Sequence, residues 1–182
     1  MLSWLCRSLL KLNGWTYDPW NREISCVIIV APHTSNWDFI VGYLYRCSQN
    51  INPYFLAKSE LFIPIFGQLL RSIGGIAVDR SQKNKQATSL VSYFQNDSVF
   101  QLVITPEGTR SQVTRWKTGF FYIAREAKVP IIPIGLDFKR KHIKVGTPLQ
   151  AVHLNQTLTE IFAFYRPIEG KYPQKLPDIN QT

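Results

Sequence analysis

The stretch ISCVIIVA, residues 24–31, decides the fold class of this chain of 182 residues. Its apolar side chains follow one another with little of the alternation that marks a half-buried strand, so we expect a strand covered on both faces. Further strands are predicted at 52–58, 75–80, 98–105, 129–138 and 142–149, and helices at 1–12, 35–47, 59–73 (broken or kinked near Pro64), 83–96, 114–128 and 157–165. This alternation predicts an α/β domain with a mostly parallel or mixed central sheet covered by helices.

Length and composition indicate one folded domain over residues 1–182. Hydrophobic residues make up 45% of the chain and charged residues 18%, which is ordinary for a protein with a hydrophobic core and unlike a disordered chain. Prolines and polar residues accumulate toward the end, so we expect residues 167–182 to form a loosely ordered tail. The three cysteines lack metal-ligand spacing and leave an odd number, so neither a metal site nor a disulfide framework is expected.

The N-terminal segment MLSWLCRSLLKL places four leucines on one helical face and two basic residues on the opposite face. Such a helix, within residues 1–20, either lies in a membrane interface or packs on the core, and the sequence leaves both alternatives open. No stretch approaches the roughly 18 apolar residues that cross a bilayer. Arg7 and Lys11 also interrupt any signal-peptide core. We therefore expect a protein that is soluble or lies peripherally on the cytoplasmic face of a membrane.

The formal net charge of +9 favours an anionic partner. The excess is uneven, because nine Lys or Arg residues lie between Arg110 and Lys144 against only Glu126 and Asp137. This basic stretch is either a solvated face or a surface for an anionic partner such as an acidic lipid surface or a phosphorylated small molecule. A nucleic-acid partner is not expected, because no recognisable binding motif accompanies the charge.

Polar clusters follow three of the predicted strands: PHTSNWD at 32–38, DRS at 79–81 and PEGTRS at 106–111. In a parallel sheet the carboxyl ends of the strands meet at one edge, where ligands gather. The sequence therefore predicts a single site built from all three clusters.

The HTSNWD cluster has two interpretations. Thr34, Ser35 and Asn36 are good helix caps, so the cluster can simply start a helix. Alternatively, His33 is a general base and Asp38, five residues on, is the carboxylate that orients it. This second geometry requires His33 in the loop before the helix and Asp38 in the first turn, where the helix dipole favours a carboxylate.

The TPEGTRS cluster brings a carboxylate and a guanidinium, Glu107 and Arg110, onto one tight turn shaped by Pro106 and Gly108. This pairing suits an acceptor that carries both a hydroxyl and a phosphate. A surface turn whose two charges merely pair with each other is the alternative. Arg80, at the end of GGIAVDR, adds a second guanidinium or only terminates its strand.

In order, HTSNWD, GGIAVDR, PEGTR and VPIIPIGL resemble the four sequence blocks of the glycerolipid acyltransferase family, of the lysophosphatidic acid acyltransferase type. The blocks span His33 to Leu136, over half of the chain. The resemblance implies a glycerol-3-phosphate acyltransferase-like fold and transfer of a fatty acyl group from acyl-CoA or acyl carrier protein to a hydroxyl of a lysophospholipid or glycerol phosphate. It implies no cofactor beyond this co-substrate.

Carried over residue by residue, the resemblance makes His33 the base and Asp38 its orienting partner. No enzyme nucleophile is then required, and no G-x-S-x-G motif is present. Residues that bind the acceptor would be Lys58, Arg80, Glu107, Gly108, Thr109 and Arg110. Pro130 and Pro133 would line an acyl-donor wall, although a buried strand with edge or bulge positions explains them equally well.

Two rival functions stay open at this stage. One keeps the chemistry but uses a non-phosphorylated lipid or an amine as acceptor, and the other is a catalytically silent lipid-binding protein. The apolar stretch LFIPIFGQLL, residues 61–70, fits all of these, because it can line an acyl groove, touch a bilayer or form a buried helix. The sequence gives no oligomeric state.

Overall fold

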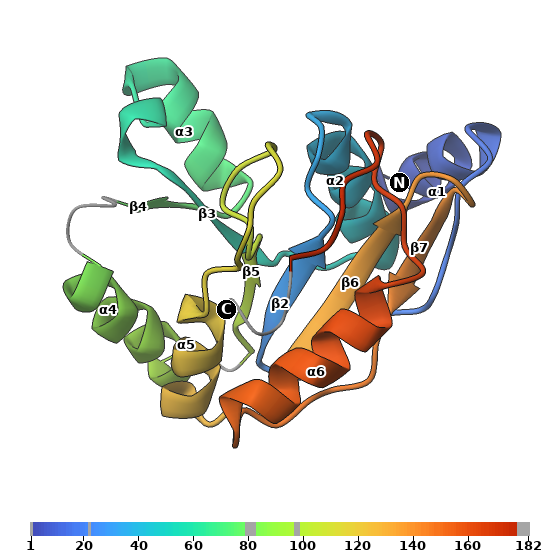
Figure 1. Cartoon of the computed structure of the whole chain (residues 1–182). Coiled ribbons are helices and arrows are strands. Elements are labelled where there is room, and N and C mark those ends of the chain that lie inside the picture. Colours follow the sequence, from blue (N-terminus) through green and yellow to red (C-terminus); the bar gives the residue numbers. More distant parts are fainter. Residues whose placement is uncertain (1, 22, 79–82, 97–98, 178–182) are drawn as a thin grey trace.

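The computed structural model describes residues 2–21, 23–78, 83–96 and 99–177. Its strands are β1 (Thr16–Tyr17), β2 (Cys26–Ala31), β3 (Tyr54–Lys58), β4 (Gly75–Val78), β5 (Gln101–Ile104), β6 (Ile131–Asp137) and β7 (His142–Val145). Its helices are α1 (Leu2–Leu12), α2 (Trp37–Gln49), α3 (Pro64–Ser72), α4 (Lys83–Asn96), α5 (Gly119–Ala127) and α6 (Leu154–Tyr165), with a 3₁₀ turn at Ser59–Leu61 (Figure 1).

The strands form one sheet in the order β1-β7-β6-β2-β5-β3-β4. Strands β2, β3, β4, β5 and β6 run parallel to one another, β7 is antiparallel to β6, and β1 is parallel to β7. The α/β fold with a mostly parallel, mixed sheet is therefore confirmed. The apolar strand β2 lies in the middle and pairs with β6 on one side and β5 on the other, so its carboxyl end opens at the centre of the sheet edge.

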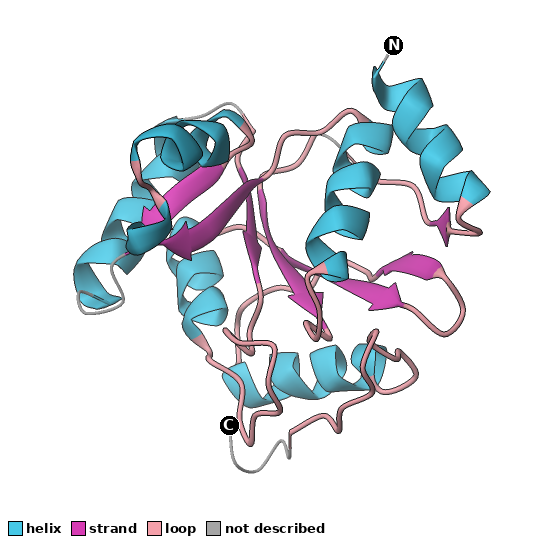
Figure 2. Ribbon diagram, turned by 90° about the horizontal axis from the view of Figure 1, so that it is seen from above, coloured by secondary structure: helices cyan, strands magenta, loops and turns pink. Residues whose placement is uncertain are grey.

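Side chains of β2 alternate between two hydrophobic cores. Val27, Ile29 and Ala31 face the core that contains side chains of α4, α5 and α6. Cys26 and Ile28 face the core that contains side chains of α1 and α2. Figure 2 shows helices on both faces of the sheet. This double coverage is the reason that β2 carries an uninterrupted apolar run.

Several predicted boundaries were wrong in informative ways. The helix predicted at 59–73 is a 3₁₀ turn followed by α3, which begins at Pro64. Proline is favourable at the first position of a helix, because a backbone N–H there would have no acceptor within the helix. The helix predicted at 114–128 begins only at Gly119. The strand predicted at 142–149 ends at Val145 and continues as a single bridge between Leu149 and Ile131.

Strand β1 was not predicted. It has two residues, and it is fixed by contacts with a distant part of the sequence: Thr16 pairs with His142, and the ring of His142 contacts the side chains of Thr16 and Asp18. Its local sequence carries only turn signals, so this strand depends on tertiary contacts.

The segment 167–177 has no regular secondary structure, yet it is held more closely than the sequence predicts. Ile168 is buried, and a Cβ added at Gly135 would collide with its side chain. The Tyr172 N–H donates to Thr34 Oγ1 at 3.2 Å, and the Lys175 N–H donates to Gln112 Oε1 at 3.0 Å. Residues 167–177 therefore cross the edge of the sheet that carries the polar clusters.

Helix α1 packs on α2 and also presents an apolar face. Cys6 and Leu10 are buried against the fold, whereas the leucines of the predicted apolar face and Trp4 are exposed. Both alternatives predicted for this helix thus remain available. Within the described residues, no helix is long and apolar enough to cross a bilayer.

Candidate active site

His33 and Asp38 meet where β2 ends. His33 lies in the loop after Ala31, and Asp38 lies in the first turn of α2. His33 Nδ1 is 3.0 Å from Asp38 Oδ2, with the histidine side chain 20% exposed and the aspartate side chain 3% exposed. The predicted pairing of the two side chains is therefore confirmed. Because the carboxylate binds Nδ1–H, Nε2 on the far side of the ring is the nitrogen that can accept a proton.

The same aspartate oxygen organises the loop around the histidine. Asp38 Oδ2 accepts the Thr34 N–H at 2.7 Å and the Ser35 N–H at 2.8 Å. Ser35 Oγ in turn accepts the Trp37 N–H at 3.0 Å, at the start of α2. The cluster is thus both a helix start and a histidine–carboxylate pair: Ser35 accepts the first helical N–H, whereas the N-cap residue Asn36 makes no side-chain cap, and Asp38 holds the loop and the ring.

The TPEGTR loop leaves β5 beside this pair, as the register of β2 and β5 requires (Figure 1). Gly108 has a φ of 64°, a left-handed conformation that glycine adopts without strain, and its N–H donates to Thr105 O at 3.1 Å. The Lys117 N–H donates to Pro106 O at 2.9 Å and fixes the far side of the loop. This tight turn directs neighbouring side chains in opposite directions.

Glu107 points into the protein. It is 7% exposed, and its carboxylate oxygens Oε1 and Oε2 accept the His33 backbone N–H at 3.2 and 3.0 Å. Burial raises the pKa of Glu107 from 4.5 to about 7, while its hydrogen bond from His33 lowers it and the charge of Asp38 raises it. The sequence grouped Glu107 with the acceptor ligands, but the structure turns its carboxylate away from solvent and onto the histidine loop.

The other predicted acceptor-binding residues that the structure describes lie at the same edge of the sheet. Thr109 and Arg110 are exposed on the loop after β5, and Lys58 is exposed at the end of β3, next to β5 in the sheet. The Gln174 side chain donates to the Arg110 carbonyl at 2.8 Å and ties the loop to the C-terminal segment. Arg80 lies outside the described residues.

Lys117 is a further candidate that the sequence did not single out. A Cβ added at Gly108 would collide with its ammonium group, so this cation lies directly over the turn that follows Glu107. The signal was available in principle, because Lys117 belongs to the basic stretch and precedes the helix start TGFF. Because Lys117 follows Gly108 by nine residues in the sequence, the motif alone does not predict this contact.

The two prolines of the fourth block do not lie beside His33. Pro130 precedes β6, and its carbonyl accepts the Val27 N–H, so it lies at the opposite edge of the sheet from His33. Pro133 is buried in β6, where a Cβ added at Gly146 would contact both its ring and that of Phe164 of α6. These positions support the alternative of a buried strand, and the acyl-donor wall stays a prediction.

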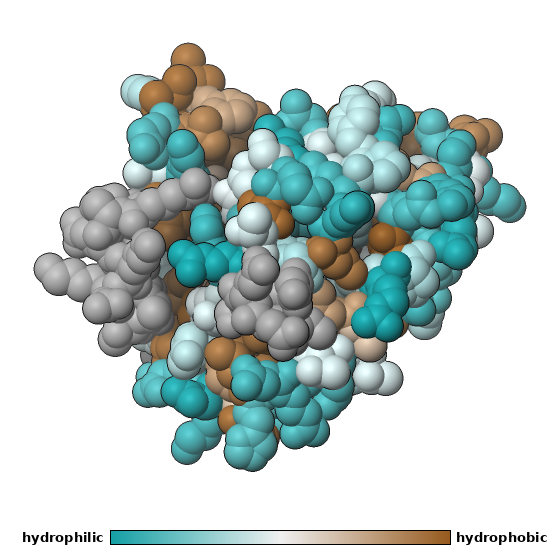
Figure 3. All heavy atoms as spheres, viewed as in Figure 1, coloured by the Kyte–Doolittle hydropathy of each residue, from teal (hydrophilic) through white to brown (hydrophobic). Residues whose placement is uncertain are grey.

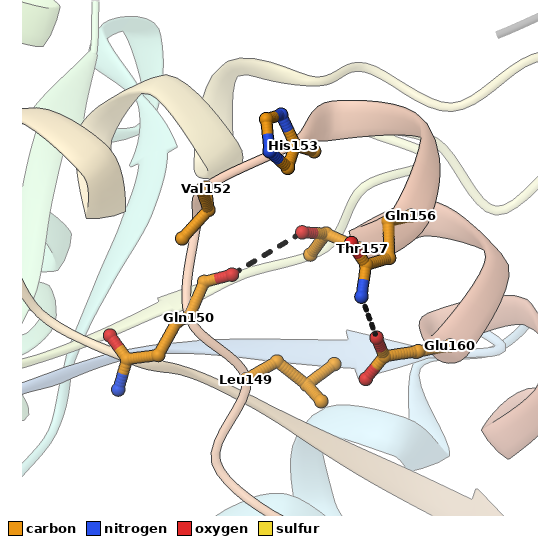
Figure 4. A pocket seen from close by; sticks show the side chains of 7 residues that line it. All are labelled: Leu149, Gln150, Val152, His153, Gln156, Thr157 and Glu160. Atoms are coloured by element: carbon orange, nitrogen blue, oxygen red, sulfur yellow. Dashed lines mark hydrogen bonds between the residues drawn. The ribbon is translucent and has the colours of Figure 1, made fainter.

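A cavity of about 280 Å³ opens at the far edge, between the start of α6 and the segment before it (Figure 4). Its lining residues are Leu149, Gln150, Val152, His153, Gln156, Thr157 and Glu160. Leu149 pairs with Ile131 at the start of β6, which places this cavity at the amino ends of the parallel strands. It contains none of the predicted site residues, so the histidine pair rather than this hollow defines the candidate site.

Comparison with known proteins gives concordant results. The sequence profile of the family described as Acyltransferase matches residues 21–137. The chain is 34% identical over 116 residues to a 1-acyl-sn-glycerol-3-phosphate acyltransferase of Escherichia coli, covering 59% of this chain and 45% of that protein. It is 28% identical over 168 residues to the protein of the same name from Pseudomonas aeruginosa, covering 87% of this chain and 61% of that protein. The chain thus spans about half the length of the curated relatives it matches.

A solved structure shares the fold. The 1-acyl-sn-glycerophosphate acyltransferase PlsC from Thermotoga maritima superposes with a TM-score of 0.61 at 15% identity, covering 91% of this chain and 76% of that chain. The matched profile extends over β2 to β6 and therefore includes His33, Asp38, Glu107 and Arg110.

Proposed function

The chain belongs to the acyltransferase family, and we propose that it moves a fatty acyl group from acyl-CoA or acyl carrier protein to a hydroxyl of a lysophospholipid or glycerol phosphate. One observation carries the proposal: a buried carboxylate holds Nδ1 of a partly exposed histidine at the end of the central strand. The similarity to relatives named 1-acyl-sn-glycerol-3-phosphate acyltransferase supports the acceptor class.

His33 acts as general base in this proposal. Its Nε2 takes the proton of the acceptor hydroxyl while that oxygen attacks the thioester carbonyl. Asp38 holds the tautomer with the proton on Nδ1 and stabilises the imidazolium that forms. The tetrahedral intermediate then expels the thiolate, the new oxygen ester remains on the acceptor, and the imidazolium gives its proton to the thiolate, which leaves as the thiol. The acyl group passes directly to the acceptor, so no acyl-protein forms.

The acceptor phosphate lies, in our proposal, over the loop after β5. Arg110 is exposed there and suits bidentate binding of a phosphate, and Lys117 adds a second positive charge over Gly108. Lys58 contributes from the neighbouring strand β3. Thr109 can donate its hydroxyl to the same group, because it is exposed beside Arg110.

We also place the protein peripherally on the cytoplasmic face of a membrane. The support is an exposed apolar surface on the segment that includes α3, which appears brown at the upper left of Figure 3. Its exposed members are Leu61, Ile63, Ile65, Phe66 and Leu69. Helix α1 presents further exposed apolar side chains, and the net charge of +9 suits anionic lipid.

The test of the proposed function is thiol release from acyl-CoA and from acyl carrier protein with a panel of acceptors. The panel contains lysophosphatidate, glycerol 3-phosphate and monoacylglycerol, each assayed with the wild-type protein and with Arg110→Ala. We expect release with the phosphorylated acceptors, and an acceptor KM that rises about tenfold or more in the variant.

Each rival function predicts another outcome of this assay. Turnover with monoacylglycerol that Arg110→Ala does not change would indicate a non-phosphorylated acceptor. Lipid binding without thiol release from either donor, with every acceptor, would indicate a silent lipid-binding protein and would refute the proposed transfer.

A further inference from the structure

Glu107 differs from its neighbours on the loop after β5 in where its side chain points. Thr109 and Arg110 are exposed, whereas Glu107 is buried and both of its carboxylate oxygens face the backbone N–H of His33. A carboxylate in this position is already occupied by a protein donor and is withdrawn from solvent. It is therefore poorly placed to bind an acceptor.

We propose that Glu107 is a positioning residue for the base: its carboxylate holds the backbone of His33, and through it the imidazole, at the end of β2. The inference rests on the proposed function, because it takes His33 as the group that accepts the proton. It assigns Glu107 to the histidine rather than to the acceptor.

Two carboxylates hold the loop at residues 33–35, each by accepting different backbone N–H groups. Glu107 accepts the N–H of residue 33, and Asp38 accepts the N–H groups of residues 34 and 35 together with the ring of His33. Hydrogen bonds from N–H to a carboxylate are stronger than those to a neutral acceptor. The backbone on which the imidazole is mounted is thus held from the strand side and from the helix side.

The loop that carries Glu107 is itself fixed by backbone hydrogen bonds. The N–H of Gly108 closes the turn on Thr105, and the N–H of Lys117 holds Pro106. The loop that carries Arg110 and the loop that carries His33 are therefore joined by the contact of Glu107 with the His33 N–H. A loss of about 1 Å in the placement of a catalytic group can reduce a rate about 100-fold, so a tether of this kind can control turnover without touching the substrate.

Protonation of Glu107 provides a second way to test its contact with the His33 N–H. The groups that face it are His33 and Asp38, with the buried Tyr165 hydroxyl and the Lys117 ammonium nearby. The pKa of about 7 means that the carboxylate is ionised above this pH and protonated below it. A protonated carboxyl carries no charge and keeps its carbonyl oxygen as the main acceptor, so its hydrogen bond from the His33 N–H is weaker. Turnover is therefore expected to fall with Glu107 protonation as the pH drops through about 7.

The deciding experiment compares Glu107→Gln with Glu126→Gln, a matched substitution at an exposed carboxylate on α5. Purified proteins that comprise residues 1–182 are assayed for kcat and for acceptor KM between pH 6 and pH 9. We expect Glu107→Gln to lower kcat on the order of 10-fold to 100-fold with acceptor KM unchanged, and to change the acid limb of the kcat profile. Glu126→Gln should behave as wild type.

A raised acceptor KM with kcat unchanged in Glu107→Gln would overturn the inference, because that is the behaviour of an acceptor ligand. Wild-type turnover in His33→Ala would instead overturn the proposed function. The two failures are therefore distinguishable.

A measurement without turnover covers the case in which Glu107→Gln does not fold. In the His33→Ala variant the backbone N–H at position 33 remains, but no imidazole titrates there. We expect its amide proton shift, followed by NMR, to titrate with a midpoint at or above about 7, because removing the ring removes a contribution that lowers the pKa of Glu107. An amide shift that is constant between pH 6 and pH 9 would contradict the contact.

Discussion

Two histidine–aspartate pairs of similar length lie at the same edge of the sheet. His33 Nδ1 is 3.0 Å from Asp38, and His142 Nε2 is 3.2 Å from Asp18. The aspartate side chains differ sharply, however, since that of Asp38 is 3% exposed and that of Asp18 is 39% exposed. The first carboxylate is therefore held by the fold at a fixed place, and the second is open to solvent.

The two rings also use their nitrogens differently. His142 contacts Thr16 through Nδ1 at 2.8 Å and Asp18 through Nε2, so both nitrogens are engaged in fastening β1 to β7. His33 has its carboxylate on Nδ1, and its Nε2 points to the other side of the ring. On the proposed mechanism a short His–Asp distance is not enough for a base, because the carboxylate must also hold the ring in place and one ring nitrogen must remain for the substrate.

The largest contrast is expected from the aspartates. Asp38→Asn keeps the shape of the side chain but no longer fixes the tautomer of His33, so kcat should fall on the order of 1,000-fold or more. Asp18→Asn should leave kcat within about twofold of wild type. Steady-state thiol release by the two purified variants measures both values. Equal effects of the two substitutions would remove the distinction between the pairs.

A second contrast concerns pH and stability. Burial raises the pKa of Glu107 to about 7 from 4.5, so the folded protein retains a proton that the unfolded chain loses between these pH values. Stability then falls as the pH rises through this window, and the ionised carboxylate reduces the free energy of unfolding above pH 7 by up to about 3 kcal/mol. Glu107→Gln should therefore gain stability relative to wild type between pH 5 and pH 8.

Denaturant unfolding at several pH values measures this difference, with Glu126→Gln as the control that should show no such trend. A wild-type minus Glu107→Gln difference that is constant from pH 5 to pH 8 would contradict the raised pKa. Together with the expected loss of kcat, the predicted result would mean that the ionised form, which supports His33, is the less stable one.

The smallest expected effect is on membrane binding, which depends on the apolar side chains around the two pairs. Exposed apolar side chains occur on the first turn of α2, beside Asp38, and on α3, whereas His142 follows a basic turn. Ile65, 87% exposed on α3, should transfer into a bilayer interface, so Ile65→Ser should weaken binding to anionic vesicles by about tenfold, or 1 to 2 kcal/mol. Val152→Ser, at the opposite edge, is the matched control. Unchanged sedimentation of Ile65→Ser with vesicles would exclude α3 as the contact.

Much of the fold could be predicted from the sequence, because its signals are local. The apolar run of β2 and the strands and helices that alternate after it gave the α/β class, the doubly covered sheet and the edge at which polar residues meet. Strand β1 and the course of residues 167–177 could not be predicted. Both are held by partners more than 60 residues away in the sequence, such as His142 for Thr16 and Gln112 for Lys175.

The site was predictable to the same extent. The spacing of His33 and Asp38 gave their contact, because it depends only on a loop followed by one helical turn. The direction of Glu107 did not follow from its motif, since it depends on the left-handed conformation of Gly108 and on the register that brings the β5 loop beside the β2 loop. Lys117 was missed for a similar reason, as its contact with Gly108 closes a loop of nine residues.

The role of His33 as general base is tested most directly by the turnover of His33→Ala beside His142→Ala, each purified and shown by circular dichroism to be folded. We expect His33→Ala to lose at least 100-fold in kcat and His142→Ala to stay within about twofold of wild type. Near wild-type turnover in His33→Ala, or an equal loss in both variants, would contradict the assignment of the base.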